Sequence, residues 1–434
     1  MKVIKFGGTS QSVIGYKKLV EIINQTILTD EKLVIVLSAV SGVTNLLEKF
    51  LETKEKKYID EVILKNIKFV DELNKEYPSN EIFIDDIFTL LFTFVSDYET
   101  NNDVYLKAKI IGYGEIISTH ILYQLVQNLS DKKKIILGNS YDYIKSSKET
   151  SKLYPCVEFY CSDEILLYLK NNQILITQGF IASSPSSKTI ILGRGGSDTT
   201  GALIANKLDA IEYQVWTDVN GIFSADPNWI INAKLMNEVN YEIVQEMAGM
   251  GAKVMHPYSI LPCKQKNIPI KIFNTFNNNE KNTIINNSNE KVFCVTSQKN
   301  VTLFKITSLC MWNGYGFVYD IFKIFSDKKI NINIITTSQF SISTTTDEKD
   351  INILKEVFED LSEKYQVEMT NNNSIVSLVT NNLEELDKYI YLPKIEYEII
   401  HYSPNNLTKS YVVHEDKTNN IIKTIHDQII KNWN

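Results

Sequence analysis

Glycine is scarce in this chain, at 17 of 434 residues, against a usual share of about 7%. It is required where φ is positive or where the backbone approaches a ligand closely. One such glycine is explained by a tight turn or a helix cap, but clusters flanked by polar residues predict a ligand site. Twelve of the glycines fall in six short places, namely Gly7 and Gly8, Gly42, Gly112 and Gly114, Gly193, Gly195, Gly196 and Gly201, Gly221, and Gly249 and Gly251.

Cysteine, positive net charge and long apolar runs are also lacking. The five cysteines are scattered, and no second Cys/His pair follows Cys156 and Cys161, so we expect reduced thiols rather than a zinc site. A net charge of −7 argues against a nucleic-acid partner, and anionic substrates would need a local group of cations. Met1 leads directly into a strand-like run, and no apolar stretch reaches about 18 residues. We therefore expect a cytoplasmic protein without a membrane span.

The common nucleotide-binding and metalloprotease signatures are absent. The sequence contains no GxxxxGK[ST], no HRD or DFG, no GxGxxG and no HExxH, which excludes a Walker P-loop, a protein-kinase loop, a Rossmann fingerprint and a zincin helix. A phosphoryl-transfer enzyme with this sequence has another design. It would rely on positioning, Mg²⁺ and cations that take up charge on the moving phosphoryl group.

Strand-like and helix-like segments alternate over the first 275 residues. This alternation predicts a mostly parallel sheet with helices on both faces. We expect strands at 2–6, 33–38, 134–137, 174–179, 189–192, 212–217 and 268–273, and helices at 16–29, 46–76, 81–98, 108–127, 199–208 and 239–248.

The sequence changes character near residue 275. Residues 276–295 are polar and rich in asparagine, which is typical of a linker. Beyond them we expect two small α+β modules at 296–370 and 371–434, the second partial or divergent. Neither has clustered polar loops, so catalysis is expected in the first half. The first module should contain strands at 301–307, 330–336 and 339–346 and helices at 316–328 and 350–364.

Two glycine-rich segments carry the strongest chemical signals. KFGGTS, residues 5–10, follows a strand, so its backbone N–H groups could cradle phosphate with Lys5 beside them. GRGGSDTT, residues 193–200, ends a strand and starts a helix that Ser197 or Asp198 is placed to cap. Arg194 in this loop could clamp a carboxylate or a phosphate with two hydrogen bonds. The simpler interpretation of the second segment is a capped helix after a tight turn.

Three further segments support a ligand site less strongly. WTDVNGIFSADP, residues 216–227, is either a hairpin or a strand whose Asp218 lies where α/β sheets bind ligands. AGMGAKVMHP, residues 248–257, adds Lys253. GYGEIIST, residues 112–119, places Glu115 at a helix start, where a carboxylate also simply complements the helix dipole.

Taken in order, KFGGTS, SAVSGVTN, the GYGE segment, GRGGSDTT, WTDVNGIFSADP and GAKVMHP closely resemble the motifs of the aspartokinases of the amino acid kinase family. The resemblance covers residues 1 to about 275. Residues Ser308 to Ser343 resemble the first of the paired ACT modules of monofunctional aspartokinases. The implied fold is a three-layer α/β sandwich (1–275), followed by ferredoxin-like ACT modules.

The resemblance implies transfer of the ATP γ-phosphoryl group to the β-carboxylate of L-aspartate, the first step of lysine, threonine and methionine biosynthesis. It implies MgATP, with Mg²⁺ held mainly by the phosphates and by no metal site of the protein. ACT modules imply feedback by lysine or threonine and a homodimer or tetramer. The implied catalytic residues are Lys5 and Asp198. The implied phosphate-binding residues are Gly7, Gly8, Thr9, Gly195, Gly196 and Ser197, and the implied aspartate-binding residues are Ser38, Thr44, Glu115 and Arg194. The implied ATP-binding residues are Thr217, Asp218, Phe223, Asp226, Lys253 and Val254.

This sequence departs from the family pattern at four positions. Phe223 stands where a tyrosine is usual, and Asn228 where an arginine is usual, so ATP binding loses a hydroxyl and a cation. Lysine-inhibited relatives carry acids at the positions of Asn333 and Gln339, and two lost charged hydrogen bonds cost about 1.5–3 kcal/mol each. The effector residues implied by the resemblance are Met311, Gly316, Val318, Asn333, Thr337 and Ser338.

Two alternatives to an aspartate kinase stay open from the sequence. One is another amino acid kinase, acting on glutamate or a carbamate-like acid. The other is a catalytically silent amino-acid sensor in which only the ACT half works, an idea that rests on Phe223 and Asn228. A silent protein is disfavoured by four intact residues, Lys5, Arg194, Asp198 and Asp218.

Overall fold

The computed structural model describes residues 1–29, 31–79, 81–129, 134–252, 255–277, 282–311, 314–393 and 396–432. The chain folds into two compact units. The first contains Met1–Ile222, Leu235–Gln245 and a segment that ends at Asn289. The second contains the chain from Glu290 onward together with two earlier pieces, Phe223–Lys234 and a segment that begins at Glu246.

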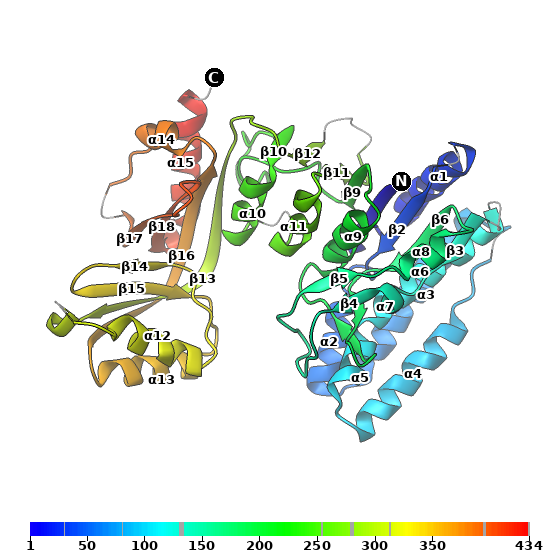
Figure 1. Cartoon of the computed structure of the whole chain (residues 1–434), viewed down its shortest axis with the longest axis horizontal. Helices are drawn as coiled ribbons and strands as arrows, with labels where there is room; N and C mark the ends of the chain where they lie inside the picture. The colour runs from blue at the N-terminus through cyan, green and yellow to red at the C-terminus, as the bar shows by residue number, and fades with distance from the viewer. Residues whose placement is uncertain are drawn as a thin grey trace. The chain divides into compact units, whose positions relative to one another are not determined.

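A mostly parallel sheet forms the centre of the first unit (Figure 1). Within the described ranges its eight strands run in the order β10-β12-β11-β9-β1-β2-β6-β3, and every neighbouring pair is parallel except β11 and β12. This confirms the predicted α/β fold. The strands are β10 (Glu238–Asn240), β12 (Thr283–Asn286), β11 (Ile270–Asn274), β9 (Glu212–Thr217), β1 (Lys2–Phe6), β2 (Leu33–Leu37), β6 (Ile174–Gln178) and β3 (Ile135–Leu137).

Helices cover both faces of this sheet, because its central strands are apolar on both sides. All five residues of β2 are buried. Ile4 and Phe6 of β1 point into a core shared with α1, α3 and α6, while α9 packs against β1 and β9. The helices of this unit are α1 (Val13–Thr29), α2 (Val43–Thr53), α3 (Lys57–Glu76), α4 (Asp85–Thr100), α5 (Val104–Ile111), α6 (Tyr113–Leu129), α7 (Ser140–Tyr143), α8 (Ile165–Leu169), α9 (Gly196–Lys207) and α11 (Pro257–Gln265). The helix α10 (Tyr241–Gly249) begins in this unit and continues into the second from Glu246.

Two predicted helices are wrong in their extent, because each is two helices. The segment 46–76 breaks after Thr53, where Lys54 adopts a left-handed φ of 60°. The segment 108–127 breaks at Gly112, whose Cβ, if it had one, would lie 2.9 Å from a side-chain carbon of Ile181. Apolar periodicity runs through both breaks, so it could not reveal them.

Strand assignments also differ from expectation in two places. The predicted strand at 189–192 is β8 (Thr189–Ile191), which lies in a separate sheet with β5 (Phe159–Cys161), β4 (Ile144–Ser146) and β7 (Ile181–Ser183). The predicted linker at 276–295 contains β12, which pairs with β10 and β11, and the start of β13. Polar composition therefore concealed a strand.

The second unit is built on an antiparallel sheet, and Figure 1 shows α12 and α13 at one end of it and α14 and α15 at the other. Over the described ranges the strand order is β14-β15-β13-β16-β18-β17. This α+β arrangement agrees with the expected ACT modules. The elements are β13 (Phe293–Thr307), α12 (Phe317–Asp327), β14 (Ile335–Thr337), β15 (Ser341–Thr346), α13 (Ile351–Ser362), β16 (Gln366–Thr380), α14 (Leu383–Leu386), β17 (Ile399–Tyr402), β18 (Thr408–His414) and α15 (Thr418–Asn432).

Two apolar cores share the long strands β13 and β16. One core takes Phe293 and Val295 from the start of β13, together with residues of α15. The other takes Phe304 and Ile306 from its end, together with residues of α12 and α13. Each of these strands is 15 residues long, so a single pair of strands joins both cores.

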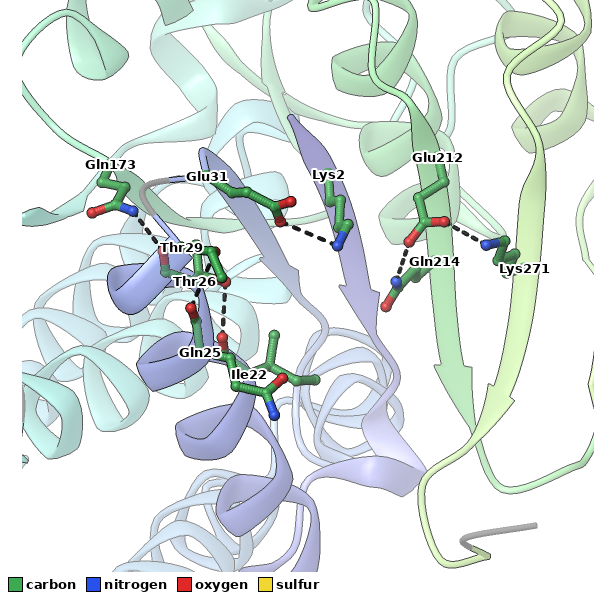
Figure 2. Close-up of polar contacts among 10 residues, drawn as sticks. All are labelled: Lys2, Ile22, Gln25, Thr26, Thr29, Glu31, Gln173, Glu212, Gln214 and Lys271. Carbon is green, nitrogen blue, oxygen red and sulfur yellow. Dashed lines mark hydrogen bonds and ion pairs between the residues drawn. The ribbon is translucent and has the colours of Figure 1, made fainter. Parts of the chain in front are cut away.

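Charged pairs line the amino end of the parallel sheet, as Figure 2 shows. Lys2 Nζ lies 3.1 Å from Glu31 Oε2, and Lys271 Nζ lies 2.6 Å from Glu212 Oε2. Burial raises the pKa of Glu212, but hydrogen bonds from Lys271 and Gln214 outweigh it, so the pKa is lowered. These ion pairs occupy the amino end of the sheet. Ligands of α/β sheets bind at the opposite, carboxyl end of the strands. In the described part of the chain no helix is both long and apolar enough to cross a membrane.

Candidate functional site

A cavity of about 760 Å³ opens at the carboxyl end of the parallel sheet. It lies beyond β1 and β2 and is closed by Glu115 of α6 and by the loop that starts α9. A second cavity of about 740 Å³, beside α4 and α5, contains none of the predicted site residues. Thirteen predicted residues line the first cavity: Lys5, Gly7, Gly8, Thr9, Ser38, Thr44, Glu115, Arg194, Gly195, Gly196, Ser197, Asp198 and Thr217.

An ion pair between Lys5 and Asp198 lies in the wall of this cavity. Lys5 Nζ is 2.8 Å from Asp198 Oδ1, and the two side chains are only 12% and 18% exposed. Lys5 lies on β1 and Asp198 in the first turn of α9, so the pair joins the sheet to the helix. The contact is between charges rather than a well-aligned hydrogen bond, since Asp198 Oδ1 receives none within the described ranges.

The amino end of α9 points its backbone into the cavity. The helix begins after Gly195, which adopts a left-handed φ of 68° and where a Cβ would lie 2.3 Å from His256 Cβ. The expectation that Ser197 or Asp198 caps this helix is wrong, because the N-cap is Gly195, without a side-chain hydrogen bond. Both side chains lie instead within the first turn. A helix start with a glycine backbone suits an anion.

Gly8 allows the loop after β1 to touch the loop after β2. A Cβ on Gly8 would lie 2.6 Å from the backbone oxygen of Ala39. The Ser41 N–H donates to the Gly8 oxygen at 3.1 Å, and the Ser38 N–H donates to the Phe6 oxygen at 3.1 Å. The two loops are therefore locked together, and Thr9 and Ser38 face one cavity.

Glu115 is a buried carboxyl group with free hydrogen-bonding capacity. Its residue is 4% exposed, and Oε2 has no hydrogen-bond partner among the described residues. Burial raises the pKa of Glu115 to about 8, although a backbone hydrogen bond from Ala39 and the nearby charge of Lys5 act in the opposite direction. A cationic group brought into the cavity would favour the ionised form.

Arg194 is exposed at the rim of the cavity. It is also the single arginine of the chain, in which every other cationic residue is lysine. Arginine presents a planar fork of donors, whereas lysine presents a point charge. The single guanidinium group of the chain therefore lies beside the cavity.

Nine lining residues are outside the predicted set. Six of them belong to the SAVSGVTN and GRGGSDTT motifs, namely Ala39, Val40, Ser41, Gly42, Asn45 and Gly193, and the other three, Glu48, Tyr154 and Phe180, were missed entirely. Phe180 follows β6 at the same sheet edge, and this strand-end position was an available signal. The hydroxyl of Tyr154 donates to Glu48 Oε1, and this contact spans more than a hundred residues of sequence. No local pattern could have paired them.

The predicted ATP residues are more dispersed. Asp218 follows Thr217 at the end of β9 and accepts a hydrogen bond from the Thr217 hydroxyl at 3.1 Å. Phe223 and Asp226 lie in the second unit. Asp226 Oδ1 accepts hydrogen bonds from the backbone and side-chain nitrogens of Asn228, at 2.9 and 3.0 Å. Lys253 and Val254 lie outside the described residues.

The predicted effector residues gather around the start of α12 and the turn between β14 and β15. Gly316 is the N-cap of α12 with a φ of 87°, and Val318 is exposed in its first turn. Met311 is buried in the core beneath them. The Asn333 N–H donates to the Thr345 oxygen at 2.9 Å, and the Asn333 side-chain oxygen is without a partner in the described ranges. Thr337 ends β14, and Ser338 follows it.

Known proteins resemble the chain over nearly its whole length. The amino acid kinase family matches residues 1–274. The lysine-sensitive aspartokinase 3 of Escherichia coli (strain K12) is 27% identical over 456 residues, which cover 99% of each chain. The crystal structure of E. coli aspartokinase III with aspartate and ADP has a TM-score of 0.82 at 24% identity, covering 99% of this chain and 100% of that one. The structure of that enzyme with lysine and aspartate has a TM-score of 0.77 at 25% identity, covering 99% of each chain.

Glu115 gives the fold a specific pH dependence. Its pKa rises from an ordinary 4.5 when unfolded to about 8 when folded, so between these values the folded chain holds a proton that the unfolded chain has released. Stability is therefore lost as pH rises through this range. We expect Glu115→Gln to melt above the wild type at about pH 9 and close to it at about pH 5.

Thermal melting across this range checks the expectation. Glu61→Gln, at an exposed glutamate of α3, is the matched control, and the pattern expected for Glu115→Gln should be absent from it. A constant difference for Glu115→Gln as well would mean that Glu115 does not titrate between these values.

Proposed function

Because the chain belongs to the amino acid kinase family, we propose that the cavity at the carboxyl end of its sheet is where ATP and L-aspartate react. The chain is an aspartate kinase, which forms 4-phospho-L-aspartate. The observation that carries the assignment of the site is the convergence of Lys5, Asp198, Arg194 and Glu115 on one cavity.

These charges suit the three ionic groups of aspartate. The Arg194 fork is matched to the α-carboxylate. Glu115 is matched to the ammonium group, whose charge would draw the proton from the buried carboxyl group. Ser38 and Thr44 would complete the pocket with hydroxyl groups. The β-carboxylate is then left free to face the phosphate donor.

The chemistry requires positioning and charge rather than a general base. A β-carboxylate oxygen, already ionised, forms the new bond to the γ-phosphorus as the bond to the bridging oxygen breaks, and ADP leaves with that electron pair. Lys5 would stabilise the charge on the phosphoryl oxygens, and Asp198 would hold Lys5 in place. The backbones of Gly7, Gly8 and Thr9 and the helix start at Gly195, Gly196 and Ser197 would face the phosphates.

The residues proposed to bind the rest of ATP are Thr217, Asp218, Phe223, Asp226, Lys253 and Val254. We propose that Mg²⁺ arrives on the nucleotide phosphates. Mg²⁺ keeps several non-protein ligands in such sites. Asn228 stands where an arginine is usual. It donates two hydrogen bonds to Asp226 and supplies no positive charge to the nucleotide.

Feedback control by lysine or threonine is proposed for the surface around Gly316, Val318 and Asn333. The lysine complex of the E. coli relative supports this class of ligand. A cytoplasmic location is proposed as well, and the free thiols of Cys156, Cys161, Cys263 and Cys294 support it.

The direct test is acyl phosphate formation from aspartate and MgATP, trapped with hydroxylamine, with and without lysine or threonine. Activity that lysine abolishes would show that the amides Asn333 and Gln339 permit lysine control. Activity that lysine leaves unchanged would support the loss of that control. No product at saturating MgATP would overturn the proposal, and a panel with glutamate and carbamate would identify another amino acid kinase.

Lys5→Ala should lower kcat by about 10²–10³-fold, because a cation at the reacting phosphoryl is lost. Aspartate binding, measured by calorimetry, should persist. Lys271→Ala is the matched control, since Lys271 also lies on a strand of this sheet and pairs with a glutamate, but at the opposite edge. Near-normal turnover of Lys5→Ala would refute the phosphate site.

Arg194→Lys should raise the KM for aspartate about 10- to 100-fold, since a lost charged hydrogen bond costs about 1.5–3 kcal/mol. The charge is kept, so the variant isolates the fork geometry. Lys266→Arg, an exposed exchange in the reverse direction, is the control. An unchanged KM would show that Arg194 does not bind the α-carboxylate.

We further propose a homodimer or tetramer, because ACT modules usually pair between chains. The mass in solution, measured by light scattering at micromolar concentration, should be at least twice that of the 49.8 kDa chain. A mass equal to one chain would refute this assembly.

A further inference from the structure

The loop that carries Phe223 and Asp226 is attached to the last helix of the chain. Ser224 lies between these two residues and is 2% exposed. Its Oγ lies 2.9 Å from Nε2 of His426, a fully buried histidine of α15. Loop and helix both belong to the second unit, and more than 200 residues of sequence separate them.

Ser224 is the anchor of this loop. Its Oγ also accepts a hydrogen bond from the Lys234 N–H at 2.8 Å, and its N–H donates to the Lys234 oxygen at 2.9 Å. Its carbonyl oxygen accepts from the Val295 N–H of β13 at 2.8 Å. The two ends of the loop therefore meet at one residue, and the position of Ser224 determines the position of the loop.

A second contact from α15 holds the returning side of the same loop. Asn232 Nδ2 donates to Asp427 Oδ1 at 3.2 Å. The helix itself is fixed, because Ile421, Ile425 and Ile429 are fully buried in the core of the second unit. Two consecutive residues of this helix, His426 and Asp427, thus hold both the outgoing and the returning side of the loop.

Packing alone does not explain a histidine at position 426, although its ring contacts that of Phe293, with centroids 5.6 Å apart. Its Nδ1 is buried without a partner in the described part of the chain, and such an unpaired group opposes folding. An apolar side chain of similar size would avoid that cost. A histidine at this position is explained by what its Nε2 holds, which is Ser224.

We propose that His426 is a positioning residue for the nucleotide. It acts through Ser224 to place Phe223 and Asp226, so the inference rests on the proposed function, in which these residues meet ATP. The last helix, within the half expected to be regulatory, would then set the affinity for nucleotide but not for aspartate.

Calorimetric binding of MgADP tests this without turnover. His426→Leu should raise the Kd about 3- to 30-fold, the range in which residues coupled to a site act. His426→Gln keeps a hydrogen-bonding group at the position of Nε2 and should restore the Kd to about the wild-type value. Ser224→Ala should weaken binding at least as much as His426→Leu, because it also removes the hydrogen bond from Lys234, and the double variant should be no weaker than Ser224→Ala. In the kinase assay the KM for ATP should rise and that for aspartate should not.

His401→Leu is the matched control, because His401 of β17 lies in the same unit, also has an unpartnered Nδ1 within the described ranges, and is remote in sequence from the loop. Equal weakening by this variant, or an unchanged Kd for His426→Leu, would overturn the proposal. Should His426→Leu fail to fold, Asp427→Ala should raise the Kd in the same direction, and its failure to do so would count against the proposal. Wild-type protein that binds MgADP but does not phosphorylate aspartate would refute the proposed function alone.

Discussion

The contact between Lys5 and Asp198 is the constraint on which the site depends. It joins the central strand β1 to the first turn of α9, and both charges are largely withdrawn from water. Removing either partner would leave a charge with little compensation. With Glu115 neutral through burial, the cavity holds this balanced pair, the cation Arg194 and the carboxylate of Glu48, which accepts a hydrogen bond from Tyr154. It can therefore receive an anionic substrate without first exposing an unpaired internal charge.

Much of the fold and site was predictable, because their signals are local. The core strands are short apolar runs, and the site loops follow them with glycines and charges at a common sheet edge. The predictions that failed concern features that depend on contacts between residues distant in sequence. One helix gives way to the next at Gly112, where Ile181 leaves no room for a side chain, and β12 forms in a polar segment because β10 and β11 flank it. Tyr154 and Glu48 meet only in the folded chain.

The composition contained a further signal for the site, since the chain has a single arginine, at residue 194. Lysine is the cationic side chain at the other positions. The point charge of lysine is therefore sufficient for the surface ion pairs, each of which contributes little to stability. Keeping one guanidinium at residue 194 indicates a requirement of geometry rather than of charge. The same reasoning applies to the glycines, which are scarce overall and retained at Gly8 and Gly195, where a Cβ would collide with its neighbours.

The shared strands of the second unit have a consequence for how this half can be inherited. Because β13 and β16 each supply residues to both cores, neither core can be deleted, duplicated or exchanged without cutting through the other. Gene rearrangements can therefore transplant this half only as a whole. Change within it must come by substitution of single residues, such as the amides at Asn333 and Gln339.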